Sequence, residues 1–183
     1  MNETDHHYLI SDLHLGHANI LRHDKRPFTD IKHHDGCMRT ACADVMSPGI
    51  TLWILGDVAA KRADLELLMC DLRGRGGKTV LIRGNHDDKA AWKHRDVFDE
   101  AYEARYVRVN NDVKMYLSHY AHRVWRNSHH GAYHFYGHSH GHLPGSGRSM
   151  DVGAPCVGYK PICLTECVQR LREQPTSPHH VDT

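Results

Sequence analysis

The chain has 183 residues, with 23 Lys or Arg against 22 Asp or Glu, so its formal net charge is +1. This balance argues against a generic basic nucleic-acid binder and against an acidic tail protein. Hydrophobic residues make up 40% of the chain, which is ordinary, but its 19 histidines point to metal chemistry, because histidine is the commonest metal ligand.

Five short runs of branched and aromatic residues predict β-strands, because each is too short for a helix. They are Tyr8–Ile10, Thr51–Leu55, Thr79–Ile82, Lys114–Leu117 and Tyr133–Tyr136. The second and third runs are almost continuously apolar, which is typical of central strands that are covered on both faces.

Helical segments are expected between these runs. Thr29 is predicted to cap a helix that continues to about Met46. Another helix is predicted over Ala60–Leu72, a short one after Asp87, and a last one over Thr165–Leu171. The apolar stripe of the Ala60–Leu72 helix comprises Ala63, Leu65, Leu67, Leu68 and Leu72.

The order of these elements predicts a mixed α/β fold. The first half alternates strand and helix, which indicates a largely parallel sheet. From about Glu100 the chain is expected to form hairpins, with a turn at 110–112, that add an antiparallel or mixed sheet. We expect one domain over residues 1–173 and a loose polar tail over residues 174–183.

Two further features predict the compartment. No apolar run approaches the roughly 18 residues that a membrane-spanning helix needs, and the acidic start lacks the apolar segment of a secretory signal. The six cysteines form no C-x-x-C pair, so reduced thiols are expected. We therefore expect a cytoplasmic protein that has no membrane partner.

Each main strand is followed at once by residues of the types that bind metal ions. In open α/β sheets, ligands bind beyond the carboxyl ends of the strands, so these side chains should share one edge. A glycine precedes several of them (Gly56, Gly84 and Gly137) and permits close backbone approach. The candidate metal ligands are Asp12, His14, Asp57, Asn85, His119, His138 and His140.

Seven ligands are too many for one tetrahedral ion. They suit two divalent ions about 3.5–4 Å apart that share a bridging carboxylate. The mixture of imidazole and carboxylate favours Mn, Fe, Zn or Ni over Mg or Ca, and Mn is the first choice. Such a pair of ions clamps a phosphoryl group and generates hydroxide near neutral pH, which predicts hydrolysis of a phosphate ester.

The order of these blocks resembles the signature of the calcineurin-like metallophosphoesterases. The blocks are Asp12-x-His14, Gly56-Asp57, Gly84-Asn85-His86-Asp87, His119 and Gly137-His138-x-His140. The resemblance implies a four-layer α/β/β/α sandwich of two mixed sheets flanked by helices. It also implies two metal sites bridged by Asp57. One site would be formed by Asp12, His14 and His140, and the other by Asn85, His119 and His138.

The resemblance assigns catalysis to the Asn85–Asp87 block. His86 matches the family's general acid and phosphate-contacting histidine, and Asn85 would stabilise phosphoryl oxygens. Asp87 would orient the loop or the His86 ring. Near the first block, His17, Asn19 and Arg26 are candidate substrate contacts, although Arg26 can equally be a solvated arginine.

Several sequence segments are similar to segments of the small, cap-free bacterial and phage members of that family. They are Ser11–Ile20, Arg26–Phe28, Ser118–Tyr120 and Gly158–Pro161. In that subgroup the segment before Gly158 often contains Asp and Asn, whereas this chain has Ala-Pro-Cys-Val at 154–157. The departure concerns substrate contacts or loop structure and leaves the metal-binding blocks intact.

The leading prediction is a phosphoesterase that hydrolyses a phosphodiester, such as a nucleotide or cyclic nucleotide, by hydroxide attack at a dinuclear metal centre. A site without a cap is open, which favours a diester. One alternative is a phosphomonoesterase acting on a small phosphorylated metabolite. Another is a nuclease, although the net charge offers no electrostatic track in bulk. The non-enzyme alternative is a metal-bound interaction scaffold, like the family's retromer subunit.

Overall fold

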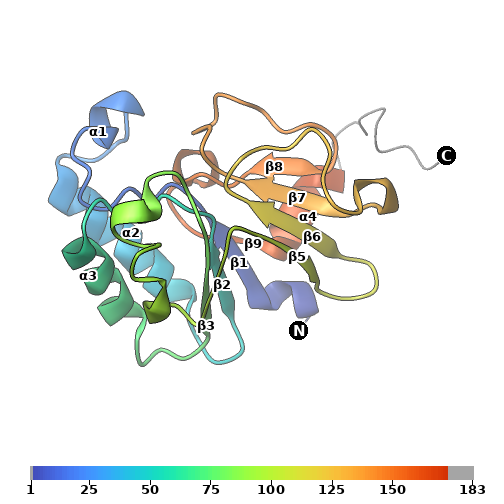
Figure 1. Cartoon of the computed structure of the whole chain (residues 1–183), viewed down its shortest axis with the longest axis horizontal. Helices are drawn as coiled ribbons and strands as arrows, with labels where there is room; N and C mark the ends of the chain where they lie inside the picture. The colour runs from blue at the N-terminus through green and yellow to red at the C-terminus, as the bar shows by residue number, and fades with distance from the viewer. Residues whose placement is uncertain (1, 173–183) are drawn as a thin grey trace.

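The computed structural model describes residues 2–172 and contains two β-sheets with helices around them (Figure 1). The first sheet has the order β4-β3-β2-β1-β9. Strands β1 to β4 are parallel, and β9 pairs with β1 in the antiparallel sense, so the sheet is mixed. Its strands are β1 (His7–Ile10), β2 (Thr51–Ile54), β3 (Lys78–Ile82), β4 (Glu100–Tyr102) and β9 (Ile162–Cys163).

The second sheet has the order β5-β6-β7-β8. Its strands are β5 (Ala104–Arg108), β6 (Lys114–Ser118), β7 (Tyr133–Tyr136) and β8 (Ser149–Asp151). Strands β5 and β6 form the hairpin predicted around residues 110–112, where Asn110 Oδ1 accepts the N–H groups of Asp112 and Val113. The expectation of further hairpins is wrong, because β6, β7 and β8 are parallel to one another.

Four α-helices in the described part of the chain pack around the two sheets. They are α1 (Ile20–His23), α2 (Ile31–Val45), α3 (Arg62–Leu72) and α4 (Leu164–Arg172). Short 3-10 helices cover Glu3–His6, Asp87–Lys89, Arg95–Val97, Ser128–His130 and Ala154–Val157. In Figure 1, α2 and α3 lie on the side of the first sheet that is remote from the second sheet. The predicted two-sheet α/β sandwich flanked by helices is confirmed.

The alternation of side chains in β1 and β2 builds two hydrophobic cores. Ile10 and Ile54 face α2 and α3 in one core, whereas Leu9 and Trp53 face the second sheet in the other. Burying each such side chain contributes about 1.5–3 kcal/mol. Both faces of these strands are therefore covered, as their apolar runs predict. Helix α4 closes the second core beside β1, β8 and β9.

The helix predictions need several corrections. The short helix α1 was not predicted, and α3 begins at Arg62, two residues later than expected. Helix α2 begins one residue later than expected, because Asp30 rather than Thr29 is its N-cap and accepts the N–H of His33 at 2.9 Å. In α3, Ala63 and Leu67 are exposed, and Met69 is buried beside the correctly predicted residues of the stripe. The predicted tail at residues 174–183 lies outside the described residues.

The outer face of the second sheet is partly covered by residues 119–132. The rings of His122 and Trp125 lie 5.4 and 5.1 Å from the ring of His134 on β7. His134 is fully buried and bonds to the backbone of Tyr116 and His122, so it is a core histidine. Within residues 2–172, we find no helix that is both long and apolar enough to cross a membrane.

Candidate metal centre

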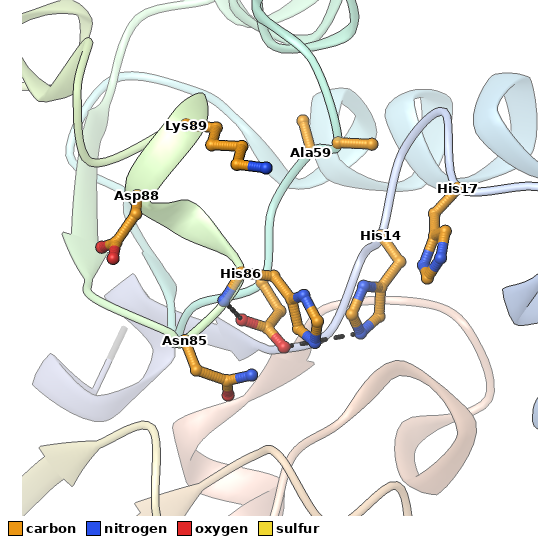
Figure 2. Close-up of a pocket in the computed structure, with 9 residues that line it drawn as sticks. His14, His17, Ala59, Asn85, His86, Asp88 and Lys89 are labelled. Atoms are coloured by element: carbon orange, nitrogen blue, oxygen red, sulfur yellow. Dashed lines mark hydrogen bonds and ion pairs between the residues drawn. The ribbon is translucent and has the colours of Figure 1, made fainter.

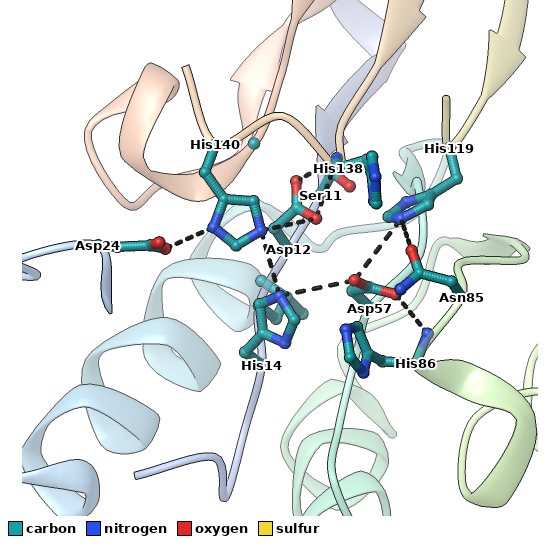
Figure 3. A network of polar contacts seen from close by, with 12 residues as sticks. Ser11, Asp12, His14, Asp24, Asp57, Asn85, His86, His119, His138 and His140 are labelled. Carbon is teal, nitrogen blue, oxygen red and sulfur yellow. Dashed lines mark hydrogen bonds and ion pairs between the residues drawn. The ribbon is translucent and has the colours of Figure 1, made fainter. Parts of the chain in front are cut away.

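The predicted ligands lie together beyond the carboxyl ends of five strands (Figure 3). Asp12 and His14 follow β1, and Asp57 follows β2. The loops after β3, β6 and β7 bring the remaining ligands, which are Asn85, His119, His138 and His140. Because the two sheets pack against each other with these ends on one side, residues that are far apart in the sequence form one polar cluster.

The first cluster consists of Asp12, His14 and His140, whose ligand atoms all lie within 4.8 Å of one another. His140 Nε2 is 3.3 Å from His14 Nε2 and 3.5 Å from Asp12 Oδ1. His140 Nδ1 donates to Asp24 Oδ2 at 2.6 Å, which orients the ring so that Nε2 faces the cluster. A histidine held in this way by a carboxylate is typical of a metal ligand.

Electrostatics at the first cluster favour a cation. Burial lowers the pKa of His14 to about 3, so its imidazole is neutral and has a lone pair available. Burial also acts to lower the pKa of His140, but the carboxylates of Asp12 and Asp24 outweigh it and raise this pKa to about 9. The same negative surroundings stabilise a metal ion, which competes with the proton for Nε2.

The second cluster consists of Asp57, His119 and His138, and Asn85 adds an amide oxygen. His119 Nδ1 donates to the Leu55 carbonyl at 2.7 Å, so in the neutral ring Nε2 carries a lone pair. That nitrogen lies 3.0 Å from Asn85 Oδ1 and 3.5 Å from Asp57 Oδ2. Three acceptors thus converge, and a cation between them satisfies all three. The donor set fits a divalent transition metal.

Asp57 lies between the two clusters. Its Oδ2 atom is 3.6 Å from His14 Nε2 in the first cluster and 3.5 Å from His119 Nε2 in the second. Its Oδ1 atom accepts the backbone N–H of His86 at 2.9 Å, and the residue is buried. This is the position that a carboxylate shared by two ions needs.

The ligands are held by strained backbone. A left-handed conformation is uncommon for residues other than glycine and costs of order 1–3 kcal/mol. Five candidate ligands adopt it, with φ angles of 58° for Asp12, 51° for His14, 55° for Asp57, 65° for His138 and 48° for His140. Such strain persists only where the surrounding structure imposes it, and it clusters at functional sites.

Glycines permit the close approach of these turns, as predicted. A Cβ atom on Gly56, whose φ is 91°, would lie 2.6 Å from both the Gly84 backbone and His119 Nδ1. A Cβ atom on Gly137 would collide with Ser11 Oγ and come within 2.6 Å of Asp12 Oδ2. Side chains at these positions would therefore push the ligand loops apart.

Asp87, which was predicted to orient the loop or the His86 ring within the catalytic block, orients the loop. Its fully buried carboxylate accepts three backbone N–H groups, from Asp57 at 3.0 Å, Val58 at 2.9 Å and Gly84 at 2.7 Å. Burial raises the pKa of Asp87, and these three bonds oppose the shift. Because its oxygens face the backbone, Asp87 orders the Asp57 turn and does not reach a reacting group.

Arg26 also differs from both expectations, since it neither faces a substrate nor lies in solvent. It is buried, and all five of its N–H groups have partners. These partners are the carbonyls of Asp12 and Leu13, His34 Nε2 and the carboxylate of Asp24. Arg26 therefore links the turn that follows β1 to Asp24, the residue that orients His140.

A cleft of about 310 Å³ opens beside Asp57 (Figure 2). His17 and His86 line it with His14, and their rings lie 5.6 and 5.5 Å from the His14 ring. Asn19, the third candidate substrate contact, lies outside this lining and is exposed where α1 begins. The cleft therefore brings together His86 and His17 but not Asn19.

Three residues that support or line the site, Asp24, Asp151 and Lys89, were not predicted from the sequence. Asp24 follows α1 and Asp151 is the last residue of the short strand β8, and neither belongs to a recognisable motif. Asp151 accepts the N–H groups of Gly141 and Gly153 and orders the turn beyond His140. Lys89 extends over the cleft from the 3-10 helix at 87–89 (Figure 2).

Residues 154–157, where the sequence departs from the pattern of the family that it resembles, form a 3-10 helix that follows β8. The buried Ala154 donates its N–H to the Ser11 carbonyl at 2.9 Å. A Cβ atom on the adjacent Gly153 would lie 2.9 Å from Asp12 Oδ2. This segment therefore supports the turn that carries Asp12.

Comparison with known proteins gives relatives without a described activity. No protein-family model matches the sequence. The chain is 26% identical over 166 residues to the uncharacterized protein MJ1445 of Methanocaldococcus jannaschii, which covers 91% of each chain. It is 31% identical over 81 residues to the Gene 66 protein of Mycobacterium phage L5, covering 44% of this chain and 39% of that one.

Among solved structures, the chain is similar to the protein of unknown function AQ665 from Aquifex aeolicus. The TM-score is 0.69 at 21% sequence identity, and the match covers 90% of this chain and 98% of that chain. This likeness shows that the two proteins share a fold.

Proposed function

We propose that the protein is a metal-dependent phosphoesterase of the calcineurin-like kind that hydrolyses phosphodiesters. One observation carries the proposal: two clusters of metal-ligand atoms flank a single buried carboxylate, that of Asp57. The five left-handed ligand residues add support, since unstrained turns would suffice for a site without a function.

The two clusters would hold two divalent transition-metal ions. Asp12, His14 and His140 would bind one ion, and Asn85, His119 and His138 the other, with Asp57 shared between them. When bound, the ions supply Lewis-acid stabilisation of the phosphoryl oxygens and lower the pKa of water toward neutrality. Mn²⁺ is the first choice, because the donor set mixes carboxylate with imidazole.

The chain's own groups would bind the phosphate and move a proton. His86 lines the cleft. Its backbone N–H donates to Asp57 Oδ1, which holds the backbone of His86 beside the carboxylate that would bridge the two ions. His86 is the group best positioned to protonate the leaving oxygen. The exposed amide of Asn85 can donate its N–H groups to a phosphoryl oxygen while its Oδ1 faces His119.

The openness of the site favours a diester. Asn85, His86 and His138 are exposed, and the cleft continues outward past His17. A substrate with groups on both sides of the phosphorus can enter such a site. A terminal phosphate would leave much of the cleft unfilled, which disfavours a monoester.

The experiment that tests this proposal compares two chromogenic esters on the Mn²⁺-loaded protein. We expect bis-p-nitrophenyl phosphate to have a kcat/KM about tenfold or more above that of p-nitrophenyl phosphate. The reverse order would favour the phosphomonoesterase. Turnover of neither ester, nor of a panel of cyclic nucleotides, would favour the interaction scaffold.

We also propose that the protein acts in the cytoplasm. Its six cysteines are all free thiols, and two of them, Cys37 and Cys70, are exposed. Exposed free thiols are typical of a reducing compartment, because they would oxidise outside it.

A further inference from the structure

We propose that the outer face of the second sheet, with the segment at 119–132 that crosses it, binds single-stranded nucleic acid and guides it into the metal centre. We call this surface the basic face. The role of the basic face in choosing a substrate rests on the proposed phosphoesterase function. Its binding of single-stranded nucleic acid does not depend on that function.

The first support is the distribution of charge along the chain. Residues 104–149 contain six of the 23 Lys and Arg residues but only one of the 22 Asp and Glu residues, Asp112. This stretch therefore has a formal charge of +5, and the rest of the chain has −4. The net charge of +1, which argued against a nucleic-acid track, is the sum of this basic stretch, about a quarter of the chain, and an acidic remainder. The basic stretch supplies His119, His138 and His140.

The second support is that these cations have no carboxylate partners. Within residues 2–172, none of the six forms an ion pair, whereas Arg62, Arg83 and Arg170 elsewhere do. On the outer face, Arg126 lies over a tyrosine ring instead, 4.9 Å from the Tyr106 ring centroid. The charge of these cations is available to a polyanion.

The third support is the continuity of the basic face with the metal centre. Tyr120 stacks edgewise on the metal-ligand candidate His138, with ring centroids 4.7 Å apart, and it is 49% exposed. Farther along, the His122 ring lies 5.4 Å from that of Tyr116 on β6. These contacts connect the centre with the outer face of the sheet.

The basic face continues across the second sheet beyond Tyr116. Tyr116 is the register partner of Tyr106, over which Arg126 lies, and the pair Arg108 and Lys114 follows at the far end of the hairpin. From Ser118 back to Lys114, β6 covers roughly 15 Å, which is long enough for several phosphates. A strand whose scissile phosphate lies at the metal centre can therefore contact these cations.

The aromatic and apolar groups on this face indicate a single strand. Tyr120, Val124 and Leu143 are large hydrophobic residues that are about half exposed, and all three belong to the basic stretch at 104–149. Unpaired bases can stack on the Tyr120 ring and contact the two aliphatic side chains, whereas a duplex hides its bases from them. The combination of cations with an exposed aromatic ring is characteristic of proteins that bind single strands.

The test measures binding of a fluorescein-labelled 12-nucleotide oligo-dT by anisotropy in EDTA, where no hydrolysis occurs. The double variant Arg123→Gln/Arg126→Gln is expected to raise Kd about tenfold. It should also reduce the slope of log affinity against log salt by about 1.4, since each phosphate contact on a single strand contributes about 0.7. A 12-base-pair duplex should bind more weakly than oligo-dT.

The matched control is Arg22→Gln/Arg73→Gln, which removes the same charge from exposed arginines outside the basic face. Its Kd should stay within twofold of the wild type. If both double variants lose the same affinity, or if oligo-glutamate of equal charge binds as tightly as oligo-dT, the proposal is wrong. Tighter binding of the duplex would also overturn it.

A parallel assay separates this inference from the proposed function. The Mn²⁺-loaded Arg123→Gln/Arg126→Gln variant should hydrolyse bis-p-nitrophenyl phosphate at the wild-type rate, because neither arginine lines the cleft. Oligo-dT binding by a protein that hydrolyses no ester would support the basic face and contradict the phosphoesterase. Ester hydrolysis without oligo-dT binding would support the phosphoesterase and contradict the basic face.

Discussion

Replacing Asp57 with Asn is expected to lower hydrolysis of bis-p-nitrophenyl phosphate about a thousandfold or more in the presence of Mn²⁺. Asp57 Oδ2 lies 3.6 and 3.5 Å from the Nε2 atoms of His14 and His119, one in each cluster. An amide has no negative charge to share between two ions. Its N–H groups would also face one set of ligand nitrogens.

The matched control for this variant is Asp88→Asn. Asp88 lines the same cleft, but its carboxylate pairs with Arg83 at 2.6 Å and is more than half exposed. We expect that variant to retain activity within about twofold, because exposed ion pairs contribute little. Metal content is measured on both variants. Wild-type turnover by Asp57→Asn would refute its bridging position.

Replacing Asp87 with Ala should destabilise the protein by about 3–5 kcal/mol. The change leaves the N–H groups of Asp57, Val58 and Gly84 without their acceptor, and a buried unsatisfied group costs about 1–3 kcal/mol. Urea unfolding in EDTA measures the loss without any contribution from bound metal. Asp87→Asn keeps one acceptor oxygen and should lose less.

Asp96→Ala provides the comparison, since Asp96 is exposed on the 3-10 helix at 95–97. Its free energy of unfolding should change by less than about 0.5 kcal/mol. If Asp87→Ala is as stable as Asp96→Ala yet loses turnover, Asp87 acts in catalysis, as its place in the Gly84–Asp87 block suggested. A large loss of stability supports its role in ordering the Asp57 turn.

That the seven candidate ligands lie together could be predicted because a local rule governs their positions. A strand ends, and a polar residue of ligand type follows at once, as Asp57 follows β2 and His119 follows β6. Parallel strands then bring these ends to one edge. The sequence therefore indicates which strand ends carry the candidate ligands. The distances between these side chains depend on how the two sheets pack.

The supporting residues could not be predicted in the same way. Arg26 and Asp24 lie in a turn without a distinctive pattern, and their partners, Asp12 and His140, belong to other elements. A charged side chain before a proline is usually solvated, and only the fold shows that Arg26 is enclosed. Buried polar networks depend on long-range contacts that a single sequence does not reveal.

Short edge elements also escaped prediction. Strands β8 and β9 have three and two residues, so they offer no periodicity to recognise. Their pairing depends on neighbours that are remote in sequence, β7 and β1. The bulk net charge does not show where cations gather, because it averages the basic stretch at 104–149 with an acidic remainder.

The most direct test of the central claim is a titration of Mn²⁺ into chelator-treated protein while hydrolysis of bis-p-nitrophenyl phosphate is followed. A dinuclear centre formed by the Asp12 and Asp57 clusters predicts no turnover in chelator and full turnover only as two equivalents bind per chain. Full activity in excess chelator, or saturation at one equivalent, would contradict it.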